Sequence, residues 1–278
     1  MCRLFGMSGG RRRVRATFWL LDAPDSLAGQ SRRQPDGTGL GYFHHHNGKP
    51  VVHKQPLPAY ADRAFRRDAR LHISRTFIAH VRYATGGGIA LENTHPFELR
   101  GRLFAHNGVL GGLDALEREL GPELASVQGA TDSERYFALV TREIERAGGN
   151  VERGVVAAAE WIAERLPVYA LNVVLTTADE VWALRYPETH ELYVLENAHG
   201  LRFGSRSLHL HLQERGRTVL VASEPLDENP DWRLLDPGEL VHIGPDLEVE
   251  ARIAVSGPPA QLLTHADLYP EEATSQSA

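Results

Sequence analysis

The second residue of the chain is its single cysteine, and its thiol is the clearest candidate for a nucleophile. An initiator methionine is readily removed before a small residue, and removal of Met1 would leave Cys2 with a free α-amine beside its thiol. The reference pKa is about 7.7–8.0 for an α-amine and about 8.5 for a thiol, so the amine can act as base for its own side chain. The alternative is that Cys2 is a small apolar residue in a first strand, Cys2 to Met7.

Two charged residues of opposite sign could bind a small zwitterion. Arg82 leaves the end of an apolar run and precedes glycines at 86–88, and its planar guanidinium can bind a carboxylate. Those glycines form either a plain turn or a flap. Asp132 opens a helical segment and could bind an ammonium group. The competing interpretations are a surface arginine at a strand end and, for the Asp132 segment, a capping box of Thr131 with Glu134, which is compatible with binding.

Two further segments carry polar groups suited to catalysis. In His106-Asn107-Gly108, a side-chain amide beside a glycine N–H could form an oxyanion hole, although an Asn-Gly turn is the simpler interpretation. In Asn93-Thr94-His95-Pro96, His95 could orient its neighbours by hydrogen bonds, or could be a structural histidine.

Neither metal binding nor a cofactor is predicted. His44, His45 and His46 are consecutive, but they adjoin an Asn-Gly turn and no acid or cysteine cluster accompanies them. The basic run Arg11 to Arg13 is short, and we interpret it as a solvated loop.

Composition limits the class of protein. The chain has 278 residues, 42% hydrophobic and 24% charged, which is typical of a globular protein. Its net charge of −6 gives no indication of nucleic-acid binding. No stretch approaches the ~20 apolar residues of a membrane span, and the N-terminus lacks a signal-peptide core. One cysteine excludes an intramolecular disulfide. We therefore expect a cytoplasmic protein with no membrane partner.

Hydrophobic periodicity predicts many strands and two long helices, hence an α+β fold or a layered αββα domain. One helix begins after Thr131, and the other presents Val155, Ala159, Ile162 and Leu166 on one stripe. The predicted strands are 40–43, 51–53, 76–81, 103–105, 171–176, 180–185, 191–195, 218–222 and 239–243. We expect a single domain over 2–270 and a disordered tail over 271–278.

Taken in order, these segments resemble one family. Cys2, the Arg82 segment, Asn93 to Pro96, His106 to Gly108 and Thr131 to Glu134 together resemble the class II glutamine amidotransferases. The similarity is greatest to stand-alone members, including the γ-glutamyl hydrolase of ergothioneine biosynthesis. Further matching segments are Pro35-Asp36-Gly37-Thr38-Gly39, Ala222-Ser223-Glu224-Pro225-Leu226, Trp232 and Pro237-Gly238-Glu239.

The resemblance, which runs from Cys2 to about Ile243, implies a fold and a set of roles. The fold would be the four-layer αββα sandwich of the N-terminal nucleophile hydrolases. Cys2 would be the nucleophile and its α-amine the base. The other implied roles are α-carboxylate binding by Arg82, α-ammonium binding by Asp132, an oxyanion hole from Asn107 and Gly108, and a pocket lined by Thr85 and Gly86.

The sequence departs from the family at three positions. Thr38 stands where this subfamily usually has tryptophan. Gly86 stands where synthase-linked members often have histidine, and Tyr83 where many of them have tryptophan.

The implied reaction is hydrolysis of a γ-glutamyl amide through a Cys2 thioester. With glutamine, ammonia would pass to a synthase partner acting in trans, because no synthase domain follows in this sequence. A larger γ-glutamyl conjugate is the second candidate substrate. Two different functions remain open. One is a non-catalytic glutamine-binding regulatory subunit, and the other is a penicillin-acylase-like hydrolase, which should lack the Arg82 and Asp132 pair.

Overall fold

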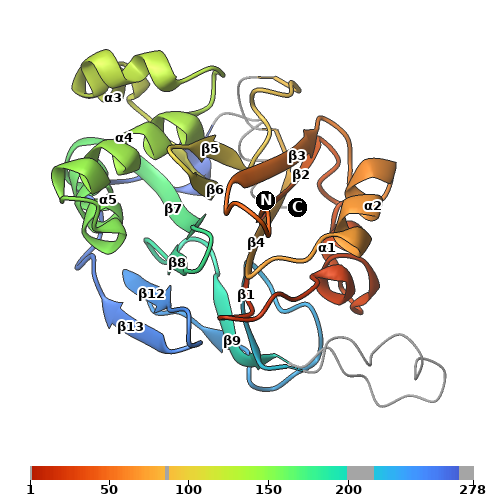
Figure 1. The fold of residues 1–278 in the computed structure, drawn as a ribbon. Helices are drawn as coiled ribbons and strands as arrows, with labels where there is room; N and C mark the ends of the chain where they lie inside the picture. The colour runs from red at the N-terminus through yellow and green to blue at the C-terminus, as the bar shows by residue number, and fades with distance from the viewer. Residues whose placement is uncertain (1, 85–87, 199–215, 269–278) are drawn as a thin grey trace.

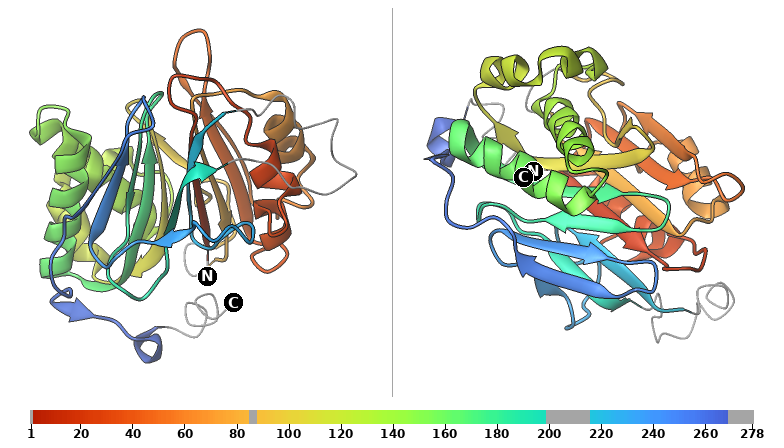
Figure 2. Two further views of the ribbon diagram at one scale, coloured as in Figure 1. Left: turned by 90° about the horizontal axis from the view of Figure 1, so that it is seen from below. Right: turned by 60° about the vertical axis from the view of Figure 1, so that its left-hand side comes forward.

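The computed structural model describes residues 2–84, 88–198 and 216–268. Two β-sheets face each other, and helices cover the outer face of each sheet (Figures 1 and 2). This is the four-layer αββα sandwich that was expected. The predicted tail 271–278, Thr85 and Gly86 lie outside the described residues. No helix in the described ranges is long and apolar enough to cross a bilayer.

The first sheet has seven strands that are antiparallel throughout. At its centre Phe5 pairs with Ala222 on one side and with Ala79 on the other. In spatial order its strands are β11 (Arg233–Leu234), β9 (Tyr193–Ala198), β10 (Thr218–Ala222), β1 (Arg3–Ser8), β4 (Thr76–Arg82), β2 (Gly37–Phe43) and β3 (Pro50–Gln55).

Within the described ranges the second sheet also has seven strands, of which only the short β14 is parallel to its neighbour. Its longest pairing joins β6 to β7 and places Asn107 opposite Asn172. Its strands are β13 (Val249–Ile253), β12 (Glu239–Ile243), β8 (Val181–Leu184), β7 (Pro167–Thr176), β6 (Arg102–Leu110) and β5 (Phe97–Leu99), with β14 (Gln261–Leu262) beside β7.

The helices form the two outer layers. Those over the second sheet are α3 (Leu113–Leu120), a 3₁₀ turn (Gly121–Ser126), α4 (Asp132–Arg146) and α5 (Val151–Arg165). Those over the first sheet are a π-helical turn (Phe18–Asp22), α1 (Leu27–Gln30) and α2 (Arg63–Leu71). A short 3₁₀ turn (His265–Asp267) lies near the end of the described chain. Both predicted long helices, now α4 and α5, are confirmed, as are all nine predicted strands.

Alternate side chains along each strand contribute to two different hydrophobic cores, one between the sheets and one beneath the helices. On β6, Leu103 and Ala105 pack between the sheets, whereas Phe104 packs against the helices. On β4, Ile78 packs between the sheets. Because side chains of a strand alternate between its faces, Arg82 on β4 and Asn107 on β6 also belong to the inter-sheet face. Cys2 immediately precedes β1, whose inter-sheet face begins at Leu4.

Candidate active site

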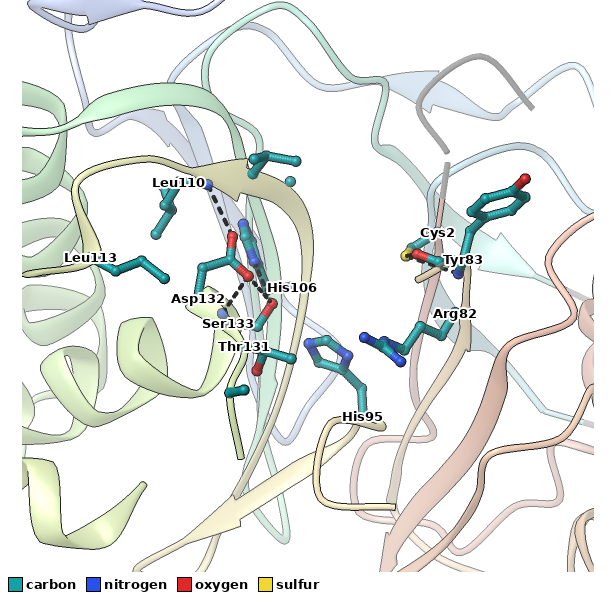
Figure 3. A pocket seen from close by; sticks show the side chains of 13 residues that line it. Cys2, Arg82, Tyr83, His95, His106, Leu110, Leu113, Thr131, Asp132 and Ser133 are labelled. Carbon is teal, nitrogen blue, oxygen red and sulfur yellow. Dashed lines mark hydrogen bonds between the residues drawn. The ribbon is translucent and has the colours of Figure 1, made fainter. Parts of the chain in front are cut away.

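One cavity collects most of the residues that the sequence singled out. It encloses about 100 Å³ at one end of the sandwich. Figure 3 shows Cys2, Tyr83 and Arg82 on one side, Asp132, Ser133 and His106 on the other, and His95 between them. Its lining residues are Cys2, Arg82, Tyr83, His95, His106, Gly108, Val109, Leu110, Leu113, Ala130, Thr131, Asp132 and Ser133.

Cys2 is partly exposed in this cavity, and its sulfur contacts the backbone of Tyr83. The Tyr83 N–H donates to Sγ at 3.3 Å, and Sγ lies 3.5 Å from the Tyr83 carbonyl, which can accept the thiol proton. Burial raises the pKa of the Cys2 thiol, and the Tyr83 N–H, Arg82 and Arg3 only partly offset this effect. With Met1 still in place the sulfur is therefore a thiol at neutral pH, and nucleophilic attack needs a base to remove its proton.

Arg82 ends β4 with its guanidinium directed toward the cavity (Figure 3). The side chain is buried and donates to the carbonyl of Gly88 at 2.8 Å. Burial lowers the pKa of Arg82, yet an arginine starts so high that it stays charged at neutral pH. The Asp36 N–H donates to the Arg82 carbonyl, and the Asp36 carboxylate accepts from Ala84 N–H at 2.8 Å, so Asp36 fixes the chain around Arg82.

Asp132 begins α4, across the cavity from Cys2. Its Oδ2 accepts from the Leu110 N–H at 2.9 Å and its Oδ1 from the Ser133 N–H at 2.7 Å. A carboxylate at a helix N-terminus is also stabilised by the helix dipole. These contacts fix the carboxylate within the cavity, where it can bind a cation.

The predicted capping box is only half correct. The Thr131 hydroxyl accepts from the Glu134 N–H, as an N-cap should. The Glu134 carboxylate does not return to Thr131, because it accepts instead from the N–H groups of Gln128 and Gly129. The Glu134 carboxylate therefore stabilises the loop before the helix. This loop contains the pocket residues Ala130 and Thr131.

Asn107 and Gly108 lie on β6 and not in an Asn-Gly turn. Asn107 is 1% exposed, and neither its amide nitrogen nor its amide oxygen has a hydrogen-bond partner among the described residues. A buried amide without partners is costly, and Asn107 is not among the residues that line the cavity. Gly108 lines the cavity, and a Cβ there would lie 1.8 Å from the Ala170 carbonyl oxygen.

His95 is a pocket residue to which the sequence gave no firm role. It is 3% exposed, and within the described ranges neither ring nitrogen has a hydrogen-bond partner. Burial lowers its pKa well below the usual value, so the ring is neutral. Its segment lies directly on β2, where a Cβ at Gly39 would be 1.9 Å from the His95 carbonyl. The alternating glycines at 37, 39 and 41 mark this close approach in the sequence, although we did not predict it from them.

The structure brings most of the predicted site residues together. Cys2, Arg82, Gly108 and Asp132 line one cavity, and Asn107 shares the inter-sheet side of the sandwich with Arg82. The sequence did not reveal Asp36, the Tyr83 backbone or Ser133. His44 to His46 form a group of stacked or tilted rings on the surface, and the described part of the chain holds no cluster of three or more potential metal ligands.

Comparisons with known proteins agree with this arrangement. Among curated proteins, the chain is 28% identical to the "Putative glutamine amidotransferase YafJ" of Escherichia coli (strain K12), covering 86% of this chain and 96% of that protein. It is also 28% identical to the "Gamma-glutamyl-hercynylcysteine sulfoxide hydrolase" of Mycobacterium tuberculosis, covering 87% and 93% respectively.

Solved structures agree in fold. A glutamine aminotransferase class-II domain protein from Silicibacter pomeroyi superposes with a TM-score of 0.60 at 22% identity, covering 90% of this chain and 98% of that one. The glutamine phosphoribosylpyrophosphate amidotransferase of B. subtilis gives 0.65 at 21%, with 92% of this chain matching 50% of that one. A sequence model of the family described as "Glutamine amidotransferases class-II" matches residues 1–257. The chain therefore belongs to the class II glutamine amidotransferases, a family of enzymes with hydrolase or amidotransferase activity.

Proposed function

We propose that this enzyme hydrolyses a γ-glutamyl amide bond through a thioester on Cys2 and releases glutamate. One observation carries the proposal: a thiol shares a small cavity with a buried arginine and a fixed carboxylate. A γ-glutamyl group has an α-carboxylate and an α-ammonium at one end and the scissile amide at the other. Arg82 binds the carboxylate and Asp132 the ammonium, so the amide carbonyl is left to Cys2.

The first half of the reaction forms the thioester. The α-amine of Cys2, once Met1 is removed, takes the thiol proton as Sγ bonds to the γ-carbonyl carbon. The Asn107 amide and the Gly108 N–H stabilise the oxygen that becomes negative. The C–N bond then breaks, and the leaving amine takes the proton from the α-ammonium. No histidine among the described residues is hydrogen-bonded to Sγ, which supports the α-amine as base.

The second half returns the enzyme to its starting state. Water, deprotonated by the same α-amine, adds to the thioester carbonyl, and the oxyanion forms again beside Asn107 and Gly108. The C–S bond breaks, the thiol regains its proton, and glutamate leaves. Atoms balance without a metal or redox partner.

Charge removal at the binding pair is expected to raise KM. Arg82→Ala and Asp132→Asn should each raise KM about 10- to 100-fold, because a hydrogen bond to a charged group contributes roughly 1.5–3 kcal/mol. In Asp132→Asn the remaining amide oxygen can accept from one of the Leu110 and Ser133 N–H groups, so one of the two contacts at the start of α4 is kept. Steady-state kinetics beside thermal melting would test this.

Asp114→Asn is the matched control for that experiment. Asp114 is also an acid in the first turn of a helix, α3, but it is exposed and does not line the cavity. It should leave KM unchanged. Unchanged KM in both Arg82→Ala and Asp132→Asn would contradict the assigned binding mode.

The leaving group distinguishes two versions of the proposal. The relatives named above include a glutamine amidotransferase and a γ-glutamyl conjugate hydrolase. With glutamine, the ammonia released would be used by a partner synthase. With a conjugate, the products would be glutamate and a larger amine.

Screening γ-glutamyl amides of increasing leaving-group size for glutamate release would decide between them. We expect glutamate release from at least one amide, with glutamine as the smallest substrate. Release from larger conjugates alone would assign a conjugate hydrolase. Binding of glutamine without turnover of any amide would instead support a non-catalytic glutamine-binding subunit and overturn the proposal.

A further inference from the structure

A buried histidine lies beside the serine hydroxyl that adjoins the ammonium-binding carboxylate. His106 lies on β6, and its Nδ1 is 2.9 Å from the Ser133 hydroxyl, while its Nε2 is 3.1 Å from the Ala170 carbonyl oxygen. The same hydroxyl lies 3.2 Å from Oδ1 of Asp132, so it can donate its proton to either neighbour. Figure 3 shows the three side chains in sequence along one wall of the cavity.

The direction of these hydrogen bonds follows from the backbone carbonyl at one end. A carbonyl oxygen can only accept, so Nε2 of His106 carries a proton. Burial lowers the pKa of His106, so the ring is neutral at neutral pH and has no second proton. Nδ1 must then accept, and the Ser133 hydroxyl must donate to it. Ser133 has one hydroxyl proton, which is therefore not available to Asp132.

This direction decides what Asp132 can bind. With the Ser133 hydroxyl directed to His106, the Asp132 carboxylate accepts from two backbone N–H groups only, and Oδ1 has one donor fewer to compete with a ligand. We infer that His106 is a positioning residue that holds the Ser133 hydroxyl away from Asp132 and so keeps the carboxylate available to an ammonium group. The inference rests on the proposed function, since it concerns how the same site binds its substrate.

Protonation of His106 would reverse the arrangement. Both ring nitrogens would then donate, Ser133 would accept from Nδ1, and its hydroxyl would turn to donate to Oδ1 of Asp132. The ammonium group of the substrate would have to displace that donor. The site would therefore bind the γ-glutamyl head more weakly as His106 becomes charged.

The groups around His106 decide when that occurs. From α4, Asp132 favours the charged ring. Tyr136 makes a T-shaped contact with 5.5 Å between the ring centroids, and it stays neutral because burial raises its pKa. From β4 and the following loop, His80 and His95 are also neutral, with their pKa values lowered by burial. From β7, the Ala170 carbonyl accepts a hydrogen bond from the ring. Desolvation is the largest effect, so the neutral ring prevails above the usual histidine pKa of about 6.5.

We expect KM to rise as the pH falls. The folded pKa of His106 is lowered, so acidification through the region below about 6.5 charges the ring and should raise KM for glutamine or the best γ-glutamyl amide, while KM stays flat above it. Asp132 itself can lose charge at still lower pH, and Ser133→Ala separates the two effects. Without the hydroxyl, the part of the KM rise that belongs to His106 should disappear.

Two variants of His106 and a double variant test the inference at neutral pH. His106→Leu removes the acceptor, so the Ser133 hydroxyl turns to Asp132 and KM should rise about tenfold with kcat little changed. His106→Leu combined with Ser133→Ala removes the competing donor and should restore KM. The conservative His106→Gln keeps an acceptor that cannot be charged, so it should retain a low KM and lose the acid rise. A double variant no better than His106→Leu alone would overturn the inference.

A readout independent of turnover keeps this test separate from the proposed function. Nitrogen-15 NMR of the histidine rings in the native chain should show His106 neutral with its proton on Nε2 at neutral pH. A proton on Nδ1 would overturn the inference even if every variant is too unstable for kinetics. If no γ-glutamyl amide is hydrolysed by the native enzyme, the proposed function fails, while the NMR result still decides the direction of the hydrogen bonds.

Discussion

Blocking the α-amine of Cys2 is expected to slow turnover by at least about 10²-fold while leaving the thiol and the fold intact. A retained Met1, or a short uncleaved extension before Cys2, converts the amine into an amide that cannot accept a proton. Because burial keeps the Cys2 sulfur in its thiol form, attack without that base should be slower by about 10²–10⁴-fold, the usual contribution of general-base catalysis. The extension also places chain where the substrate must enter.

The measurement compares two preparations of the same chain. Mass spectrometry identifies the N-terminal residue of each, and glutamate release from the best γ-glutamyl amide gives the rate. Cys2→Ser, with its own N-terminus verified, is the matched control, because it keeps the amine and replaces the thiol with a weaker nucleophile. Equal melting temperatures would show that each protein is folded. Full activity in the extended protein would contradict the N-terminal nucleophile mechanism.

Replacement of Asn107 by alanine is expected to lower kcat by about 10²–10³-fold, the usual cost of removing one oxyanion donor. The donor acts on charge that develops only at the tetrahedral stage, so KM should change little. Stability should also change little, because the Asn107 amide has no hydrogen-bond partner among the described residues that the substitution could orphan.

Asn172, which pairs with Asn107 across β6 and β7, is a matched control. It is fully buried, but its amide donates to the carbonyls of His190 and Glu191 and accepts from the Tyr186 N–H. Asn172→Ala leaves these groups unsatisfied and should lower the melting temperature, at a cost of about 1–3 kcal/mol for each orphaned group. A kcat loss in Asn172→Ala as large as in Asn107→Ala, or raised KM with intact kcat in Asn107→Ala, would contradict the oxyanion role.

The sequence by itself determined most of the elements. Short apolar runs located β4 and β6, and helical spacing located α4 and α5, because these signals depend only on neighbours along the chain. It also indicated the chemistry of the site, since a single cysteine at position 2 and an arginine and an aspartate of opposite charge can be recognised without a fold. Most of the family's segments are present in order, and this order identified the reaction class.

Local sequence patterns predicted the structure incompletely where a residue had more than one possible hydrogen-bond partner. Thr131 and Glu134 have the spacing of a capping box, but the Glu134 carboxylate bonds to Gln128 and Gly129. Asn107 and Gly108 have the sequence of a turn, but they continue β6 because β7 provides partners for this stretch. In both places a contact outside the local pattern is preferred, and such contacts cannot be seen in spacing alone.

Only the tertiary structure decided which side chains share the cavity and in what state. Cys2 meets Tyr83 across 81 residues of sequence, and His106 meets Ser133 across 27. Burial at the end of the two sheets makes the Cys2 sulfur a thiol and His106 a neutral ring. Protonation and hydrogen-bond direction depend on desolvation and on the one partner within reach. Both are properties of packed layers, so the sequence specifies the candidate groups and the fold sets their protonation and hydrogen bonds.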